Sequence, residues 1–263
     1  MKLIKPFDEL TIQDNFMFKR VMQNKELCKT LIEKLLHIKV KDITYPTENK
    51  AINMLLPSRG VRVKVHVGDD TDKIYDVEMQ CTYDSTNLLV KYMRHEEDLM
   101  TDEQIRNGTP CEELNDTYII FICTYDPFSN GLAKYEFGFR CKENPKLDLD
   151  DGQTEIFLNA KGADAAQDPF LAAFLRYVDG KDMAITDPFI EKLDEEVAFV
   201  KKLGQVRREY RLLADEFDRW ALEWQERERL RITKNMFKAG FSDEQVMQAT
   251  FDKIDLDAKH PED

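Results

Sequence analysis

Three polar side chains alternate along IYDVEMQ at residues 74–80, namely Asp76, Glu78 and Gln80. Because strand side chains point to the two faces in turn, these three share one face if the segment is a strand. Carboxylate and amide oxygens are ligands that Mg²⁺ prefers, and a protein usually supplies only one or two carboxylates to it. Bound metal activates water and stabilises the charge that develops in phosphodiester hydrolysis. An exposed strand face carries the same residue types for solubility, so both interpretations stay open.

The candidate strand is predicted to form half of a β-hairpin. Residues 61–67 alternate valines with Arg62, Lys64 and His66, and GDDTDK at residues 68–73 has the composition of a turn. We therefore expect a hairpin with one apolar face and one polar face. Asp76 and Glu78 would lie on the polar face.

The remaining pattern predicts an α/β (α+β) protein. Helical periodicity covers residues 11–38 and 86–105, and the apolar run that opens DTYIIFICTYDPF at 116–128 is typical of a buried central strand. Further strands are expected at 134–141 and 154–162. The order of these elements predicts an α/β or α+β sheet domain that ends near residue 162.

Residues 166–263 are expected to be mainly helical. Between Pro188 and Ala239 no proline interrupts the chain, and aromatic and aliphatic residues recur at intervals of three and four. This stripe comprises Tyr210, Leu213, Phe217, Trp220 and Trp224. Such a seam packs either on the core or on a second copy, which would make a homo-oligomer through residues 188–238. Gly240 then resembles a helix C-cap, and Ser242 with Gln245 resembles a capping box.

Composition limits the partners and the location. A formal net charge of −13 opposes loose association with nucleic acid, although a local basic patch remains compatible with it. The N-terminus lacks the apolar stretch of a signal peptide, and no segment has the ~20 apolar residues that cross a bilayer. We expect a cytoplasmic protein without a membrane partner. The five cysteines form no CxxC pair, which indicates ordinary reduced thiols.

Several of these segments, taken in order, resemble the PD-(D/E)XK nuclease family transposases, also called recombination-promoting nucleases. The resemblance runs from about residue 8 to 162 and is carried chiefly by the strings VEMQ and IIFIC-x-x-DPF. It also involves DNFMFKRVM at 14–22, the strand GVRVKVHV, and EIFLNAKG. A weaker similarity covers MFKAGFSDEQVMQAT near the C-terminus. The family implies a restriction-endonuclease-like core over residues 1–165, in which a mixed sheet is flanked by helices, and Mg²⁺- or Mn²⁺-dependent cleavage of DNA.

The resemblance also implies roles for individual residues. Glu78 matches the metal-binding Glu, Gln80 the amide that helps to orient the attacking water, and Asp14 the acid of the first helix. Arg94 matches a helix arginine expected to meet DNA. Lys64 falls where the metal-binding Asp is expected. An ammonium group there would repel a divalent cation and pair with Glu78, unless Asp76 replaces the missing ligand.

Three hypotheses follow for the function. The first is an active metal-dependent DNA endonuclease linked to recombination or transposition. The second is an inactive relative that binds DNA or a protein partner, favoured by Lys64 and by the acidic composition. The third is a self-associating regulatory protein in which the helical arm carries the function and the nuclease-like core is a scaffold.

Overall fold

The structure is a computed structural model that describes the backbone of residues 5–45, 61–66, 73–80, 86–180 and 187–256. The chain divides into two compact units. One comprises residues 6–206, and the other comprises residues 1–5 with 207–263. The first unit contains the sheet, and the second contains nearly all of the C-terminal helical arm.

Six strands form one mixed sheet in the order β1-β2-β3-β4-β6-β5. Their bounds are β1 Asp42–Thr44, β2 Val61–His66, β3 Lys73–Gln80, β4 Thr117–Cys123, β5 Lys134–Phe137 and β6 Gln153–Asn159. The pairs β3–β4 and β4–β6 are parallel, whereas β1–β2, β2–β3 and β5–β6 are antiparallel. The antiparallel pairing expected for the hairpin, the buried strand β4 and the mixed sheet are therefore confirmed, whereas the predicted turn at residues 68–72 lies outside the described residues.

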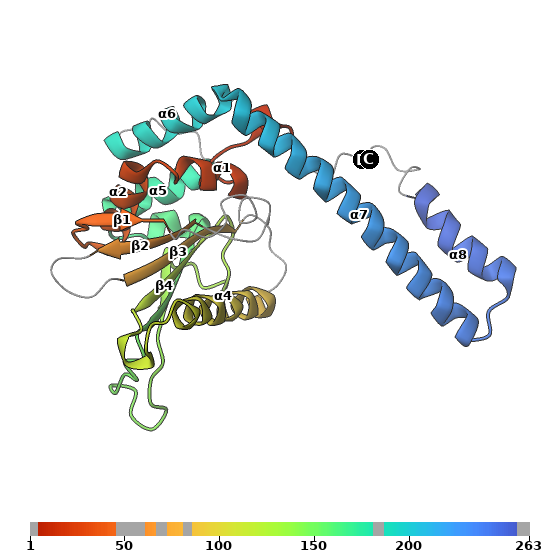
Figure 1. Ribbon diagram of the computed structural model, residues 1–263, viewed down its shortest axis with the longest axis horizontal. Helices are drawn as coiled ribbons and strands as arrows, with labels where there is room; N and C mark the ends of the chain where they lie inside the picture. Colours follow the sequence, from red (N-terminus) through yellow and green to blue (C-terminus); the bar gives the residue numbers. More distant parts are fainter. Residues whose placement is uncertain (1–4, 46–60, 67–72, 81–85, 181–186, 257–263) are drawn as a thin grey trace. The chain divides into compact units, whose positions relative to one another are not determined.

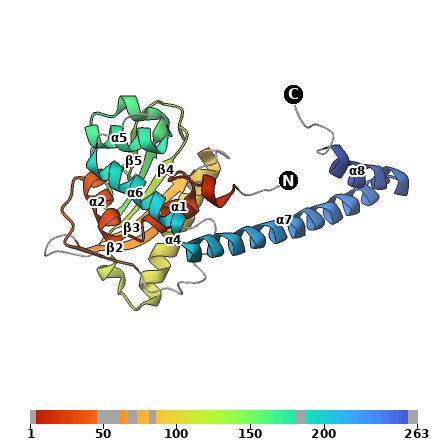
Figure 2. The ribbon, with the colours of Figure 1, turned by 90° about the horizontal axis from the view of Figure 1, so that it is seen from above.

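Helices cover both faces of the sheet (Figure 1). On one face lie α1 (Asn15–Val21), α2 (Lys25–Leu36), α5 (Pro169–Val178) and α6 (Pro188–Lys202), which pack on one another. Seen from above, α1 and α6 cross the same region of the sheet (Figure 2). The helical region was expected to begin at residue 166, but α5 and α6 belong to the sheet-containing unit. They do so because each buries an apolar face there, including Phe174, Leu175 and Leu193.

On the opposite face lies α4 (Thr86–Arg106), the crossover helix between the parallel strands β3 and β4 (Figure 1). Register fixes which side chains meet it. Ile119, Phe121 and Phe157 point to the α4 side, where they form a hydrophobic cluster with Met93 and Met100 of the helix. Ile120 and Ile122 have the other parity and point to the four-helix side. The central strand is thus buried on both faces.

The prediction of one continuous helix over residues 11–38 is wrong, because the structure has two helices there, α1 and α2. The chain leaves the helix after Val21, and Asn24 starts a new one by accepting a hydrogen bond from the Leu27 amide at 3.4 Å. Asn24 also donates to Glu196 of α6 at 3.0 Å. A second break, at Leu203, separates α6 from the arm helix α7 (Gly204–Lys238).

Asp126, in the DPF string that follows β4, organises the turn leading to β5. Its carboxylate accepts hydrogen bonds from the amides of Phe128 (3.2 Å), Ser129 (3.0 Å) and Gly131 (2.7 Å), and from the hydroxyl of Tyr135 (2.8 Å). Partial burial of Asp126 opposes its ionisation, but these hydrogen bonds outweigh that effect and hold its pKa below the ordinary value. In the described structure, the Asp of the DPF string thus has a structural role.

Replacing Asp126 by Asn should destabilise the sheet-containing unit by about 2 kcal/mol at pH 7, because it removes the charge that four donors share. A lowered pKa means that this contribution is present above about pH 4 and is lost as pH falls through the folded-state pKa. Urea unfolding followed by circular dichroism measures the change. Asp148→Asn, which removes only an exposed ion pair with Arg140, should cost under about 0.5 kcal/mol. Equal costs for the two variants would contradict the assigned role.

The second unit contains most of α7, followed by α8 (Asp243–Leu256). Gly240 has φ +86°, as a C-cap requires. The Ser242 amide donates to Gln245 Oε1 at 3.0 Å and the Gln245 amide donates to Ser242 Oγ at 3.4 Å, so the predicted capping box is confirmed. Among the helices that the structure describes, none combines the length and hydrophobicity needed to cross a membrane.

Candidate functional site

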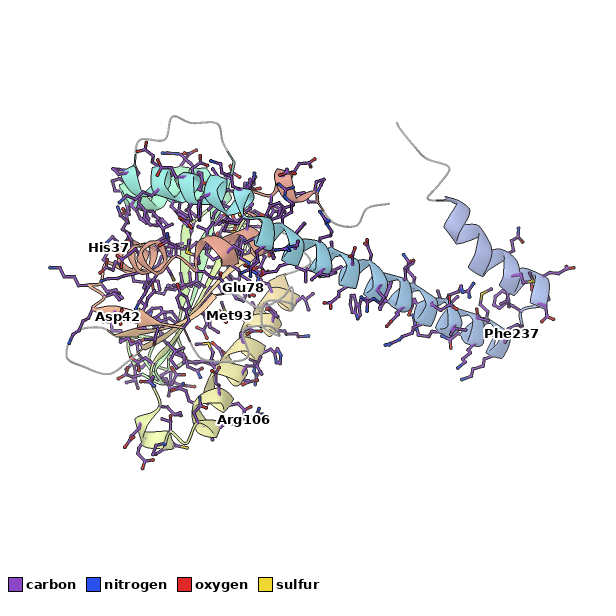
Figure 3. The ribbon with its side chains drawn as sticks, turned by 45° about the horizontal axis from the view of Figure 1, so that its top comes forward. His37, Asp42, Glu78, Met93, Arg106 and Phe237 are labelled. Carbon is purple, nitrogen blue, oxygen red and sulfur yellow. The ribbon has the colours of Figure 1, made fainter. Side chains whose placement is uncertain are left out.

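Glu78 lies near the end of β3, between the sheet and α4. Figure 3 shows it beside Met93 of that helix, whereas Arg106 lies at the helix's other end. Glu78 is 0% exposed and Asp76 is 2% exposed. Of the two interpretations, that of a solvent-exposed strand face is therefore wrong for these positions, because α4 covers the polar face that carries them.

Both oxygens of Glu78 accept hydrogen bonds from neighbouring side chains. The hydroxyl of Tyr92 donates to Oε1 at 3.0 Å, and the amide of Gln80 donates to Oε2 at 3.0 Å. Tyr92 is itself fixed, because its ring stacks on Phe121 with centroids 5.8 Å apart. The carboxylate is thus held in one orientation by a residue of α4 and by its own strand.

Two further carboxyl groups lie close enough to affect the charge of Glu78. Burial raises the pKa of Glu78 well above its ordinary value, and the charges of Asp76 and Glu96 raise it further. Lys19 of α1 and the Tyr92 hydroxyl act in the opposite direction. Asp76, Glu78 and Glu96, called the carboxylate cluster below, are each 2% exposed or less. Such a set favours a bound proton or a bound cation.

Sequence reasoning missed Lys19, Tyr92 and Glu96 as members of this site. Glu96 lies among charged residues in the sequence, but the structure buries it. Helical spacing could have indicated this, because Leu89, Met93, Glu96 and Met100 recur at intervals of four, three and four, and all four are buried. Tyr92 lies four residues before Glu96, on the same side of α4.

The structure gives Asp14 and Arg94 other surroundings. Asp14 is the N-cap residue of α1, and its Oδ2 accepts hydrogen bonds from the Thr11 amide at 2.7 Å and the Thr11 hydroxyl at 3.2 Å. These hydrogen bonds give Asp14 a structural role at the start of the helix. Arg94 lies exposed on α4, as do its neighbours Lys91 and His95.

Strand register separates Lys64 from Glu78. Lys64 is paired with Ile74, four residues along β3 from Glu78, which corresponds to about 13 Å at ~3.3 Å per residue. The expected ion pair of Lys64 with Glu78 therefore does not follow from the register, and the side chain of Lys64 lies outside the described residues. Arg62 is the residue paired with Asp76. No Asp or Glu occurs anywhere from Asn49 to Gly68, so no carboxylate of that segment replaces the expected Asp.

A second pair of acidic residues joins α4 to the sheet. Burial raises the pKa of Glu97 to about 8, and a hydrogen bond with Glu155 of β6 contributes further to the rise. A proton bound to Glu97 is sufficient to explain the arrangement. Glu97 therefore titrates in the same direction as Glu78.

The carboxylate cluster provides oxygen ligands of the type that Mg²⁺ or Mn²⁺ binds. In the described part of the chain, no three His, Cys, Asp or Glu side chains are arranged to hold a metal ion. Mg²⁺ usually takes only one or two protein carboxylates, so Asp76 and Glu78 are sufficient in number. The donor types fit a divalent cation, and Asp76 and Glu78 are the residues that would hold it.

Comparisons with family models, with curated proteins and with solved structures find no match to the chain. The class of protein is therefore described by its fold and site alone. It is an α/β protein with a mixed sheet flanked by helices, a buried carboxylate cluster and a C-terminal helical region.

Proposed function

We propose that this protein is a PD-(D/E)XK-type nuclease of the transposase kind, which cleaves DNA phosphodiester bonds with Mg²⁺ or Mn²⁺. The observation that carries the proposal is the buried carboxylate cluster, in which burial, and after it the charges of Asp76 and Glu96, raise the pKa of Glu78. The strand order, with an antiparallel hairpin β2–β3 followed by a crossover helix and a parallel strand β4, supports a restriction-endonuclease-like core. A DNA substrate also accords with the cytoplasmic location expected from the sequence.

Each residue of the site has a distinct task in this proposal. A bound divalent cation would supply an activated water and would stabilise charge on the phosphate oxygens. Asp76 and Glu78 would hold the cation, and Tyr92 and Gln80 fix the orientation of the Glu78 carboxylate. Lys19 favours the ionised form of Glu78. The Gln80 amide helps to position the attacking water, and Arg94, exposed on α4, contacts the DNA backbone.

A second candidate function is an inactive relative that binds DNA or a protein partner. Two observations favour it. The segment from Asn49 to Gly68 lacks any Asp or Glu, and Glu78 is 0% exposed. The fold would then serve as a scaffold, and the cluster would be filled by a proton.

A plasmid-nicking assay separates the two functions. With Mg²⁺ or Mn²⁺, the natural protein should convert supercoiled plasmid to nicked circles, and Glu78→Ala should lower the rate by at least about 100-fold. Lys64→Asp, which adds a carboxylate to β2, should change the rate far less. Glu136→Ala in the edge strand β5 is the matched control and should cleave normally.

Two outcomes would contradict the nuclease proposal. If neither the natural protein nor Lys64→Asp cleaves with either metal, catalysis is excluded under these conditions and the binding role is favoured. If only Lys64→Asp cleaves, the natural protein is an inactive relative that retains the rest of the site.

A further inference from the structure

The two tryptophans of this chain lie on one side of one helix and are both exposed. Trp220 is 63% exposed and Trp224 is 56% exposed, and the sequence contains no other tryptophan. Phe217 precedes them on the same side and is partly exposed. Earlier in the stripe, Tyr210 is buried and donates its hydroxyl to the Lys5 carbonyl at 2.7 Å. The exposed part of the stripe therefore begins at Phe217.

The same stripe changes its chemistry after Trp224. The intervals of three and four continue through Arg227, Arg231, Lys234 and Lys238, so aromatic positions are followed by cationic ones along a single side of α7. Three acidic residues, Glu209, Glu216 and Glu223, border the aromatic part at intervals of seven. One half of the stripe is thus aromatic with an acidic border, and the other half is cationic.

We propose that the face of α7 formed by Phe217, Trp220, Trp224, Arg227 and Arg231 binds the same face of a second copy of this chain in an antiparallel pair. In an antiparallel arrangement with its two-fold axis at the level of residue 222, Trp220 of one copy meets Trp224 of the other. Phe217 of one copy meets Arg227 of the other, and the Glu216 carboxylate beside Phe217 lies next to that arginine. Each contact then occurs twice, as a two-fold interface requires.

Charge selects this orientation over the alternatives. A parallel pair would set Arg227 beside Arg227 and Arg231 beside Arg231, which is repulsive. The antiparallel pair instead places Arg227 over the Phe217 ring of the other copy and next to Glu216, and sets Arg231 opposite Leu213. Within one copy, Arg227 pairs with Glu223 at 3.8 Å and both groups are well exposed, so this weak ion pair is readily exchanged for an intermolecular one.

The size of the contact indicates a weak, concentration-dependent dimer. A tryptophan buries about 150–250 Å², so four of them supply at most roughly 600–1,000 Å². Stable interfaces bury at least about 1,200 Å², and the difference has to come from Phe217 and the arginine stems. We therefore expect a dissociation constant in the micromolar range.

Because both tryptophans lie in the proposed contact, the fluorescence of the full-length chain reports on it directly. On dilution from about 100 µM to about 0.1 µM, the emission maximum should move to longer wavelength as the rings become hydrated. Sedimentation over the same range should show the mass falling from two chains to one. Trp224→Glu should raise the dissociation constant at least about tenfold.

Leu222→Glu is the matched control. Leu222 is 66% exposed and lies about 200° around the helix from Trp220, so it should change the dissociation constant by no more than about twofold. A charge exchange tests the orientation. Glu216→Arg and Arg227→Glu should each weaken the dimer, and the double variant should restore it.

Three results would overturn the proposal. The first is a single-chain mass at all concentrations. The second is an equal effect of Trp224→Glu and Leu222→Glu on association. The third is an emission maximum that does not change on dilution and shifts only when single-stranded DNA is added. That result would show that bases of a nucleic acid stack on the tryptophans. None of these results depends on nuclease activity, so the dimer and the proposed function are tested separately.

Discussion

Replacement of Glu78 by Gln is expected to abolish the proposed metal-dependent cleavage of DNA and, at the same time, to make the protein more stable above neutral pH. Glu78 is fully buried beside Asp76 and Glu96, so desolvation and repulsion between the carboxylates make its ionised form unfavourable. Glutamine has nearly the same shape and no charge. We expect about 2 kcal/mol of added stability at about pH 8, or roughly 4–8 °C in melting temperature for a protein of this size.

The pH dependence follows from the direction of the pKa shift. A carboxyl group whose folded-state pKa is raised above the unfolded value stabilises the fold below about pH 4.5 and loses that contribution as pH rises toward the folded-state pKa. The gap between Glu78→Gln and the natural protein should therefore be near zero at pH 4 to 4.5 and widest at alkaline pH. Glu97 titrates in the same direction but is present in both proteins, so it cancels in the difference.

Thermal unfolding with and without Mg²⁺ completes this test. Mg²⁺ at millimolar concentration should raise the melting temperature of the natural protein at about pH 8 and leave that of Glu78→Gln unchanged. Glu136→Gln, in an exposed strand position, should behave like the natural protein. A lower melting temperature for Glu78→Gln at alkaline pH would show that the ionised Glu78 stabilises the fold, contrary to the charge balance described here.

Gly162→Ala is expected to destabilise the sheet-containing unit by about 3 kcal/mol. Gly162 lies in the short helix η3 (Ala160–Ala165), and a Cβ atom there would come within 2.5 Å of the Leu132 carbonyl oxygen and 2.9 Å of Asn159 Nδ2. Those two groups form a hydrogen bond of 2.9 Å at the end of β6. The new methyl group would displace backbone and break that bond.

Gly138→Ala is the control for this prediction, because no heavy atom lies within 4 Å of the Cβ position and the backbone has no positive φ. It should change the free energy of unfolding by less than about 0.5 kcal/mol. Urea unfolding should be followed by far-ultraviolet circular dichroism, since both tryptophans lie in the other unit. Similar midpoints for the two variants would contradict the close approach at Gly162.

Local sequence patterns were sufficient for much of the fold. The valine alternation predicts β2, the apolar run predicts β4, and Ser242 with Gln245 predicts the start of α8. These features depend on residues close in the chain, so their pattern is visible without the tertiary structure. The predicted α/β or α+β sheet domain follows from the order of such elements, whereas the mixed sheet with flanking helices was an implication of the family resemblance.

Other features depend on contacts that local patterns do not contain. The strand β1 has three residues and exists through its pairing with β2. The break at Asn24 is fixed by a side chain that caps α2 and also bonds Glu196, 172 residues later. A pattern of period 3.6 runs across both helices and conceals the break.

The site shows the same division. Asp76, Glu78 and Gln80 share one face, as alternation predicts, but alternation alone does not tell a covered face from an exposed one. The face is buried because α4 packs over it, and the same helix brings Glu96 and Tyr92 to the site. Lys19 approaches from a helix 59 residues earlier in the chain, which no spacing rule predicts.

The position of α4 has a kinetic consequence. The same helix that shields the carboxylate cluster supplies Met93 and Met100 to the hydrophobic cluster over Phe121 and Phe157. If the helix must detach to admit solvent to Glu78, those aromatic rings are exposed in the same event. Exchange of ions and protons with the buried acids would then proceed at the pace of local unfolding, far below the diffusion limit. Slow uptake of metal, followed by a long residence time, would be the signature of this architecture.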